Sequence, residues 1–244
     1  MVKEKEGPPR GIQKREFNPE AWKPRTELGR KVKAGEIKDI DEIFNSGIKI
    51  LEAEIVDMLI PNLESELLSI GQSKGKFGGG KKSIWKQTQK KTREGNKPKF
   101  ATFAVIGNKD GLVGVGYGKS KETMPAREKA IRNAKLNIIR IKRGCGSWAC
   151  GCNSPHSIPL KTSGKCSAVE MEILPAPKGT RLCIEEECKK ILDFAGIKDV
   201  YSKSYNSKTK LNLVKACFDA LKNLSKIKIQ EAYIKSSGTI MGKK

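Results

Sequence analysis

The chain has 244 residues, enough for two small domains and an extension. Its 49 Lys and Arg residues against 27 Asp and Glu residues give a net charge of +22, which favours a polyanion as partner. No apolar run is long enough to span a membrane and the start, MVKEKEGPPRG, has no apolar signal core. We therefore expect a cytoplasmic chain without a membrane partner, whose seven cysteines are thiols or metal ligands rather than disulfides.

Residues 1–70 are predicted to form a helical N-terminal extension. The first 23 residues are charged, contain prolines and have no apolar pattern that would give a core of their own. Thr26 is suited to cap the first helix and Gly35 to end it. Apolar spacing and these signals predict four short helices. They are expected at 27–34, 39–47, 52–59 and 62–70, with a proline between the last two.

Residues 71–99 carry ten Lys and Arg residues against one acidic residue. A run of glycines makes the first half flexible, and Phe77 and Trp85 are interleaved where they can stack on bases. This composition fits two alternatives, a solvated charged loop or an RNA-binding element that is disordered in the free chain.

Residues 99–121 have the pattern of a β-hairpin with a turn at Asn108-Lys109-Asp110-Gly111. On the second arm, apolar residues alternate with Gly114, Gly116 and Gly118, so one strand face is bare backbone. Such a face indicates close approach, either of a packed helix or of phosphates. The alanine stripe in residues 122–138 predicts a helix that could fill this role.

These glycines do not form a nucleotide-binding motif. A Walker A loop needs glycine where Val113 stands, and a Rossmann fingerprint needs its glycines at the opening of a helix. We therefore expect no ATP or NAD site and no small-molecule substrate.

The stretch FAVIGNKDGLVGVGYGKSKETMPAREKA resembles the signature of ribosomal protein five of the small subunit (universal S-five; protein two in eukaryotes). The segment PRTELGRKVKAGEIKDIDEIF resembles the extension that archaeal and eukaryotic members carry and bacterial members lack. ILPAPKGT, AGIKDVYSKS and NLVKACFDALKNL resemble landmarks of the family's second domain. The resemblance implies an archaeal-type member of this family.

The fold class expected is α+β, with two small two-layer α/β domains after the extension. The resemblance implies a double-stranded-RNA-binding-like domain at 71–140 and the family's second domain at 141–225. The residue pattern predicts strands at 138–142, 166–174 and 199–204 and helices at 186–194 and 209–224. Residues 226–244 are expected to form a basic tail that is loose or becomes ordered on RNA. Relatives often have a second glycine where this chain has Arg181, which leaves that loop's conformation open.

The resemblance also implies a function. The chain would be a structural constituent of the small ribosomal subunit and not an enzyme. It would bind small-subunit rRNA, help form the mRNA entrance with its neighbours, proteins three and four, and support decoding accuracy. The basic residues predicted to contact rRNA are Lys82, Lys86, Lys90, Lys91, Arg93, Lys97, Lys99, Lys119, Lys121, Arg127, Arg132, Arg140, Lys142 and Arg143.

A C-x₄-C-x-C-x₃-H cluster predicts a structural zinc site formed by Cys145, Cys150, Cys152 and His156. Three thiolates and one imidazole make a closed tetrahedral set, and nearby glycines supply tight turns. Family members generally keep the histidine without the cysteines, so free thiols and a packing or RNA-binding role for His156 stay open. The other cysteines are predicted core residues: Cys166, Cys183, Cys188 and Cys217.

Two other classes of function have little support. An enzyme acting on nucleic acid through the cysteines would need paired carboxylates or a histidine base beside them, and the sequence offers neither. A zinc-containing transcription regulator would need a helix with base-contacting side chains, and no segment has that pattern.

Overall fold

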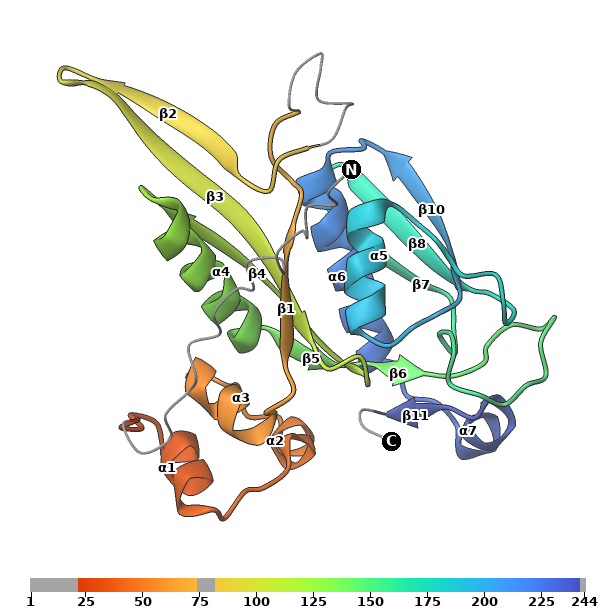
Figure 1. Cartoon of the computed structure of the whole chain (residues 1–244). Helices are drawn as coiled ribbons and strands as arrows, with labels where there is room; N and C mark the ends of the chain where they lie inside the picture. Colours follow the sequence, from red (N-terminus) through yellow and green to blue (C-terminus); the bar gives the residue numbers. More distant parts are fainter. Residues whose placement is uncertain (1–21, 74–81, 242–244) are drawn as a thin grey trace, which may run out of the picture.

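The computed structural model describes residues 22–73 and 82–241 as an α+β fold (Figure 1). The helices are α1 Glu27–Ala34, α2 Ile40–Ser46, α3 Ala53–Leu59, α4 Thr123–Leu136, α5 Glu186–Phe194, α6 Lys210–Lys226 and α7 Glu231–Ser237. The strands are β1 Glu64–Leu68, β2 Lys86–Thr92, β3 Gly95–Gly107, β4 Leu112–Ser120, β5 Ile138–Arg140, β6 Lys142–Arg143, β7 Thr162–Cys166, β8 Val169–Pro175, β9 Leu182–Cys183, β10 Val200–Asn206 and β11 Ile240–Met241. None of the helices in these ranges has the length and hydropathy needed to cross a membrane.

The first sheet is built on the long strand β3, and its order is β1-β3-β4-β5. β1 and β2 pair with successive parts of β3, so Leu68 lies opposite Phe103 and Lys86 opposite Ala101. The helix predicted at 62–70 is therefore wrong. Its apolar spacing fits a helix, but as strand β1 the segment buries Leu68 completely and satisfies the edge of β3.

The predicted hairpin and its covering helix are confirmed as β3, β4 and α4. The glycine face of β4 packs directly on helix backbone. A Cβ atom added at Gly116 would lie 2.1 Å from Ala134 N, and one at Gly118 would lie 2.1 Å from Ala126 O. The bare strand face thus accommodates a helix and not a phosphate chain.

The opposite face of the first sheet packs on the second domain. Phe103, Val105, Val113 and Val115 share one core with residues of α5 and α6. Beyond these helices lies the second sheet, of order β7-β8-β10-β9, so the layers run α4, first sheet, α5 with α6, second sheet (Figure 1). The two expected α/β domains are confirmed, and they are fused through a common core.

The strand predicted at 138–142 does not open the second sheet. β5 pairs with β4 in the first sheet, and β7 is the strand that pairs with β8. β7 has the sequence TSGKC, which carries no alternating apolar signal, and a Cβ atom added at its Gly164 would lie 2.2 Å from Ala216 O of α6. Its pairing is set by this tertiary contact and not by local pattern.

Helices α1 to α3 form a small core of their own that closes over the first sheet at Leu112 and Ile138. Trp22, which belongs to the segment expected to lack a core, is buried in this cluster; residues 1–21 lie outside the described ranges. Glu52 ties the segment together by accepting hydrogen bonds from Arg25 N and Thr26 N at 2.8 and 2.6 Å. Burial disfavours its charged form, but these hydrogen bonds outweigh that effect and lower the pKa of Glu52.

The C-terminal segment is folded where a tail that is loose or ordered on RNA is predicted. It forms α7 and then β11, whose Ile240 lies opposite Arg143 of β6. Cys145 N also donates to Ser237 O at 2.8 Å. The predicted core cysteines divide: Cys188 and Cys217 are buried, Cys166 is half-buried, and Cys183 is exposed.

Candidate nucleic-acid interface and metal centre

A two-stranded ribbon formed by β2 and the first half of β3 projects from the first sheet (Figure 1). The segment WKQTQKKTREGNKPKF resembles the family's first strand and its basic loop, and we predict that residues 74–99 are disordered in the free chain. In the structure the part from Lys86 on forms paired strands, because Thr92-Arg93-Glu94-Gly95 makes a tight turn. Gly95 has φ +109°, and Thr92 Oγ1 donates to Gly95 O at 2.7 Å. The lysine- and glycine-rich piece at 74–81 lies outside the described residues, and Lys82 is half-buried at the base of the ribbon.

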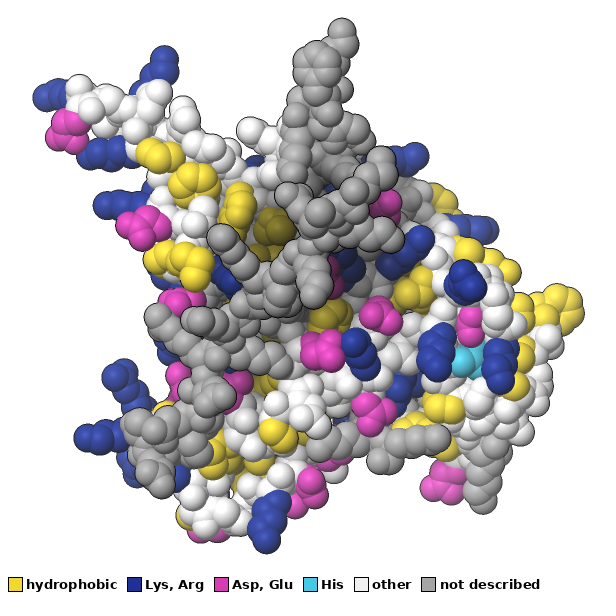
Figure 2. All heavy atoms as spheres, in the orientation of Figure 1, with side chains coloured by type: hydrophobic (Ala, Val, Ile, Leu, Met, Phe, Trp, Pro, Cys, Tyr) yellow, Lys and Arg dark blue, Asp and Glu magenta, His cyan; other side chains and the backbone are white. Residues whose placement is uncertain are grey.

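The ribbon is a concentrated positive surface. Its exposed cations are Lys86, Lys90, Lys91, Arg93, Lys97 and Lys99. Figure 2 shows Lys and Arg side chains along its edges. Lys90 lies directly opposite Lys97, a like-charge pair that destabilises a hairpin in water. Lys97 forms an ion pair with Glu94 at 2.6 Å. Lys90 forms no ion pair with any residue of the described ranges.

The positive surface continues into a hollow of about 580 Å³ where β3, the end of β4 and the start of α4 meet. Its lining includes three of the predicted rRNA-binding residues, Lys99, Lys119 and Lys121. Glu122 also lines it. Lys129 also lines the hollow. The sequence places it with Arg127, Arg132 and Lys135 on the side of the helix away from the alanine stripe, a face that is either solvated or in contact with phosphates.

The predicted cations beyond the hollow have different surroundings. Arg132 is exposed on α4 and Arg127 is half-buried there. Arg140 turns toward the N-terminal extension, where it meets Asp41 at 3.1 Å and Asn45 at 2.9 Å. Arg140 therefore joins the first sheet to α2.

Lys142 and Arg143 lie inside the molecule, with exposures of only 5% and 6%. Lys142 donates to Ile227 O, and burial lowers its pKa. Arg143 pairs with Asp110 at 2.6 Å. Sequence reasoning counts both as surface cations because their partners are distant in the chain. The structure gives them internal roles, so we leave them out of the interface.

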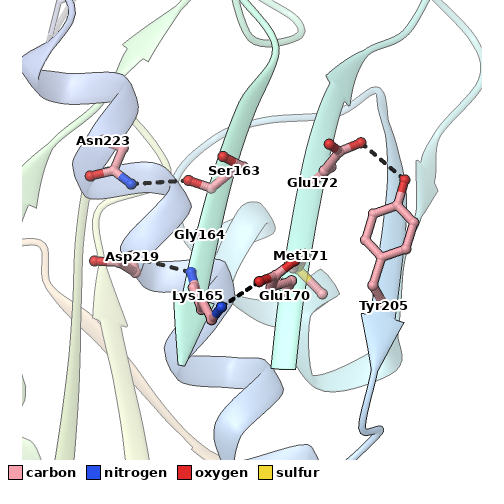
Figure 3. A pocket seen from close by; sticks show the side chains of 9 residues that line it. All are labelled: Ser163, Gly164, Lys165, Glu170, Met171, Glu172, Tyr205, Asp219 and Asn223. Carbon is pink, nitrogen blue, oxygen red and sulfur yellow. Dashed lines mark hydrogen bonds and ion pairs between the residues drawn. The ribbon is translucent and has the colours of Figure 1, made fainter. Parts of the chain in front are cut away.

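A second hollow, of about 350 Å³, lies on the second domain between the sheet and α6 (Figure 3). Three carboxylates line it, those of Glu170, Glu172 and Asp219. Lys165 contacts Glu170 at 2.6 Å, and Tyr205 donates to Glu172 at 3.3 Å (Figure 3). Acidic side chains predominate there, which disfavours a phosphate.

The predicted metal ligands are brought together by the loop between β6 and β7. One ligand atom from each of Cys145, Cys150, Cys152 and His156 lies within 4.8 Å of all the others. Cys150 Sγ is 3.9 Å from His156 Nε2. The four residues could hold a metal ion, and their three sulfurs and one imidazole nitrogen suit zinc by ligand type and number.

The thiols differ in acidity. Burial and hydrogen bonding with the neighbouring cysteines raise the pKa of Cys145 to about 11. Hydrogen bonds from Ser154 lower the pKa of the exposed Cys152 to about 6, and the two side chains are 3.1 Å apart. A thiolate is the form that binds metal, so Cys152 is the ligand most easily supplied in that form at neutral pH.

His156 has a second partner behind the cluster. Its Nδ1 lies 2.8 Å from Asp199 Oδ2, and both side chains are buried. Asp199 lies in the segment AGIKDVYSKS, at the start of the strand predicted at 199–204, but neither feature marks it as a partner of His156. Only the fold brings the two residues together.

Comparison with known proteins agrees with this architecture. The family model "Ribosomal protein S5, N-terminal domain" matches residues 84–142, and "Ribosomal protein S5, C-terminal domain" matches residues 164–234. The small ribosomal subunit protein uS5 of Nanoarchaeum equitans is 50% identical over 226 residues, which cover 92% of this chain and 97% of that protein. The uS5 of Methanocaldococcus jannaschii is 45% identical, covering 93% and 98%.

The fold and these matches define a ribosomal protein of the small subunit, which is not an enzyme. The chain belongs to the ribosomal protein S5 family and is similar to its archaeal members. The expected family is thereby confirmed. The Cys₃His cluster at 145–156 falls between the two segments that the family models match.

Proposed function

We propose that this protein binds small-subunit rRNA through the β2–β3 ribbon and the lysine-lined hollow beside it. The observation that carries the proposal is the pairing of Lys90 with Lys97 on a ribbon with a large excess of cations. Such a ribbon is electrostatically unfavourable alone and favourable against phosphates, which release counterions as lysines replace them. The hollow lined by Lys99, Lys119, Lys121 and Lys129 extends the same field to the start of α4.

The proposed RNA contact is confined to the first domain. The hollow on the second sheet carries Glu170, Glu172 and Asp219, which would repel phosphate. The second domain instead packs through α5 and α6 on the first sheet and so supports the strand from which the ribbon projects.

Family membership supports a finer proposal. As a structural constituent of the small subunit, in the cytoplasm, the chain would help form the mRNA entrance beside proteins three and four and support decoding accuracy. A ribbon that reaches beyond the domain body suits contact with RNA inside an assembly.

We also propose that the Cys₃His cluster holds a structural zinc ion. A tetrahedral site places neighbouring sulfur and nitrogen ligands about 3.5–3.8 Å apart, so the cluster needs to contract by only about 1 Å. Its four protein ligands would leave no position open for water, which fits a structural ion and not a catalytic one. Such an ion would cross-link the loop, which has little apolar core.

The RNA proposal is tested by the salt dependence of binding to an rRNA fragment. The variant Lys86→Gln/Lys90→Gln/Lys91→Gln/Arg93→Gln removes four exposed ribbon cations. The log–log slope against salt should fall by about 0.7–0.9 for each phosphate that these side chains no longer neutralise, or about 3 in all. The matched control changes four exposed lysines of the second domain: Lys161, Lys165, Lys203 and Lys208. Equal slopes for wild type and the ribbon variant, with both folded, would refute the proposal.

The zinc proposal is tested by elemental analysis of protein purified without chelator. We expect about one zinc per chain. Cys152→Ser should lose the metal, whereas Cys183→Ser, which removes an exposed cysteine outside the cluster, should keep it. A metal-free wild type with reactive thiols at all three cluster cysteines would rule the site out.

A further inference from the structure

A hydrogen-bond network behind the metal centre joins it to the loop at 177–181. Asp199 Oδ2 contacts His156 Nδ1 at 2.8 Å. The other oxygen, Oδ1, accepts from Gly179 N at 3.1 Å and from Arg181 N at 2.7 Å. One buried carboxylate thus holds both the imidazole and the loop backbone.

The hydrogen bond between the two side chains determines which imidazole nitrogen can bind a metal. A carboxylate accepts hydrogen bonds and does not donate them, so Nδ1 of His156 carries the proton when Asp199 is ionised. Nε2 then has a lone pair directed to the cluster, where Cys150 Sγ lies 3.9 Å away. Carboxylates that hold the second nitrogen of a metal-binding histidine orient the ring and raise its basicity.

The loop depends on Asp199 for its shape. Gly179 has φ +95° and Arg181 has φ +63°, and the second value is uncommon for a residue with a side chain. These are the same two residues whose amides donate to Asp199. The loop carries Lys178 and Arg181 exposed to solvent. Figure 2 shows Lys and Arg side chains on both sides of the histidine.

Backbone hydrogen bonds prevent the two ends of the network from moving independently. His156 O accepts from Lys198 N at 2.8 Å and from Asp199 N at 3.1 Å. Ser157 Oγ donates to Asp199 O at 2.5 Å and accepts from Ala176 N at 3.3 Å. A change in the orientation of His156 is therefore transmitted to the beginning of β10 and to the loop.

We propose that Asp199 is the positioning residue of the metal centre and that metal binding, acting through Asp199, fixes the cationic loop at 177–181. The inference rests on the proposed zinc site. When the metal is bound, the His156 ring is held at Nε2, which keeps Asp199 Oδ1 aligned with the two loop amides. When the metal is removed, the ring is held from one side only and the loop loosens.

The first test needs no substitution. Amide hydrogen exchange is measured on the full chain, zinc-loaded and after stripping with a chelator. Exchange at Gly179 and Arg181 should become at least about tenfold faster on stripping, while the amides of Val105 and Val115 in the first sheet stay unchanged. Equal loop exchange in both states of a protein shown to bind and release zinc overturns the coupling.

The second test is Asp199→Asn, with zinc affinity measured by competition against a chromophoric chelator. If the asparagine oxygen still accepts from the loop amides, its NH2 group faces Nδ1 of His156 and favours the tautomer with the proton on Nε2, the nitrogen that should bind the metal. Zinc affinity should therefore fall about 10- to 100-fold although all four ligands remain. Asp193→Asn, at an exposed carboxylate on α5, is the control and should change nothing. Wild-type affinity in folded Asp199→Asn overturns the positioning role alone. A wild type that binds no zinc overturns the zinc site as well.

Discussion

Replacing Gly116 by alanine would place one methyl group between β4 and α4. The added Cβ would lie 2.1 Å from Ala134 N and 2.2 Å from Ala130 O. Carbon atoms in van der Waals contact lie about 3.5–4.0 Å from their neighbours, so α4 would have to retreat by more than about 1 Å. Both obstructing groups are helix backbone, which cannot rotate away as a side chain can.

The loss of stability comes from the gap that would open between α4 and the first sheet. Ala126, Ala130 and Ala134 are fully buried against the sheet, and a gap of 0.5–1 Å removes about a quarter to a half of each dispersion interaction. Overpacking usually costs about 1–3 kcal/mol, and we expect about 3 kcal/mol here because no side chain can yield. That decrease is a large fraction of a total stability of about 5–15 kcal/mol.

The assay is denaturant unfolding of the full chain, followed by circular dichroism with a chelator present throughout. Gly151→Ala is the matched control, because a Cβ there meets nothing within 4 Å and the effect of alanine on the unfolded chain is the same. Gly151→Ala should stay within about 0.5 kcal/mol of wild type. If Gly116→Ala unfolds at the same denaturant concentration as Gly151→Ala, the close packing of α4 on β4 is wrong.

Three further predictions concern charged residues. Glu52→Gln should lower stability by about 1–2 kcal/mol in urea unfolding at pH 7. The pKa of Glu52 in the folded protein lies below 4.5, so the difference in unfolding free energy between wild type and variant should have its full size above pH 4.5. It should disappear as pH falls through the folded pKa. A difference that does not change with pH would contradict this prediction. Arg143→Gln should lower the unfolding free energy by about 1.5–3 kcal/mol because the ion pair with Asp110 is removed, without changing the RNA salt slope. Lys90→Glu places an opposite charge against Lys97, so it should stabilise the isolated protein by up to about 1 kcal/mol in thermal unfolding. The same change should weaken RNA binding. A variant in which stability and RNA affinity both rise or both fall would contradict this prediction.

The sequence was sufficient to predict the fold where the local residue pattern and the tertiary packing favour the same structure. The alternation of Gly114, Gly116 and Gly118 in β4 and the alanine stripe of α4 are complementary surfaces, and either one implies the other. It failed at β1, where apolar residues at helical spacing become a strand because β3 offers an edge. It also failed at β7, whose glycine has meaning only against α6.

The Cys₃His cluster was predictable because its four members fall within twelve residues, so chain geometry alone keeps them close. Asp199 was not predictable, since 43 residues separate it from His156. The positive φ of Arg181 likewise depends on amides that bind that distant carboxylate. The short-range pattern thus gives the proposed ligand set, and the fold adds the carboxylate that contacts its histidine.

Which cations meet RNA depends on where the acidic residues lie in the fold, more than on net charge. Asp57 pairs with Lys135 of α4 at 2.6 Å, and Glu66 of β1 pairs with Lys190 of α5 at 2.7 Å. Such carboxylates join the extension and β1 to the rest of the molecule, and they neutralise cations that a linear count would assign to the RNA surface. The ribbon carries one carboxylate, Glu94, for its many lysines. A hairpin with like charges placed opposite each other lowers the stability of the isolated protein. Phosphates at this surface would reduce the repulsion between the lysines, so the ribbon is where we expect RNA to bind.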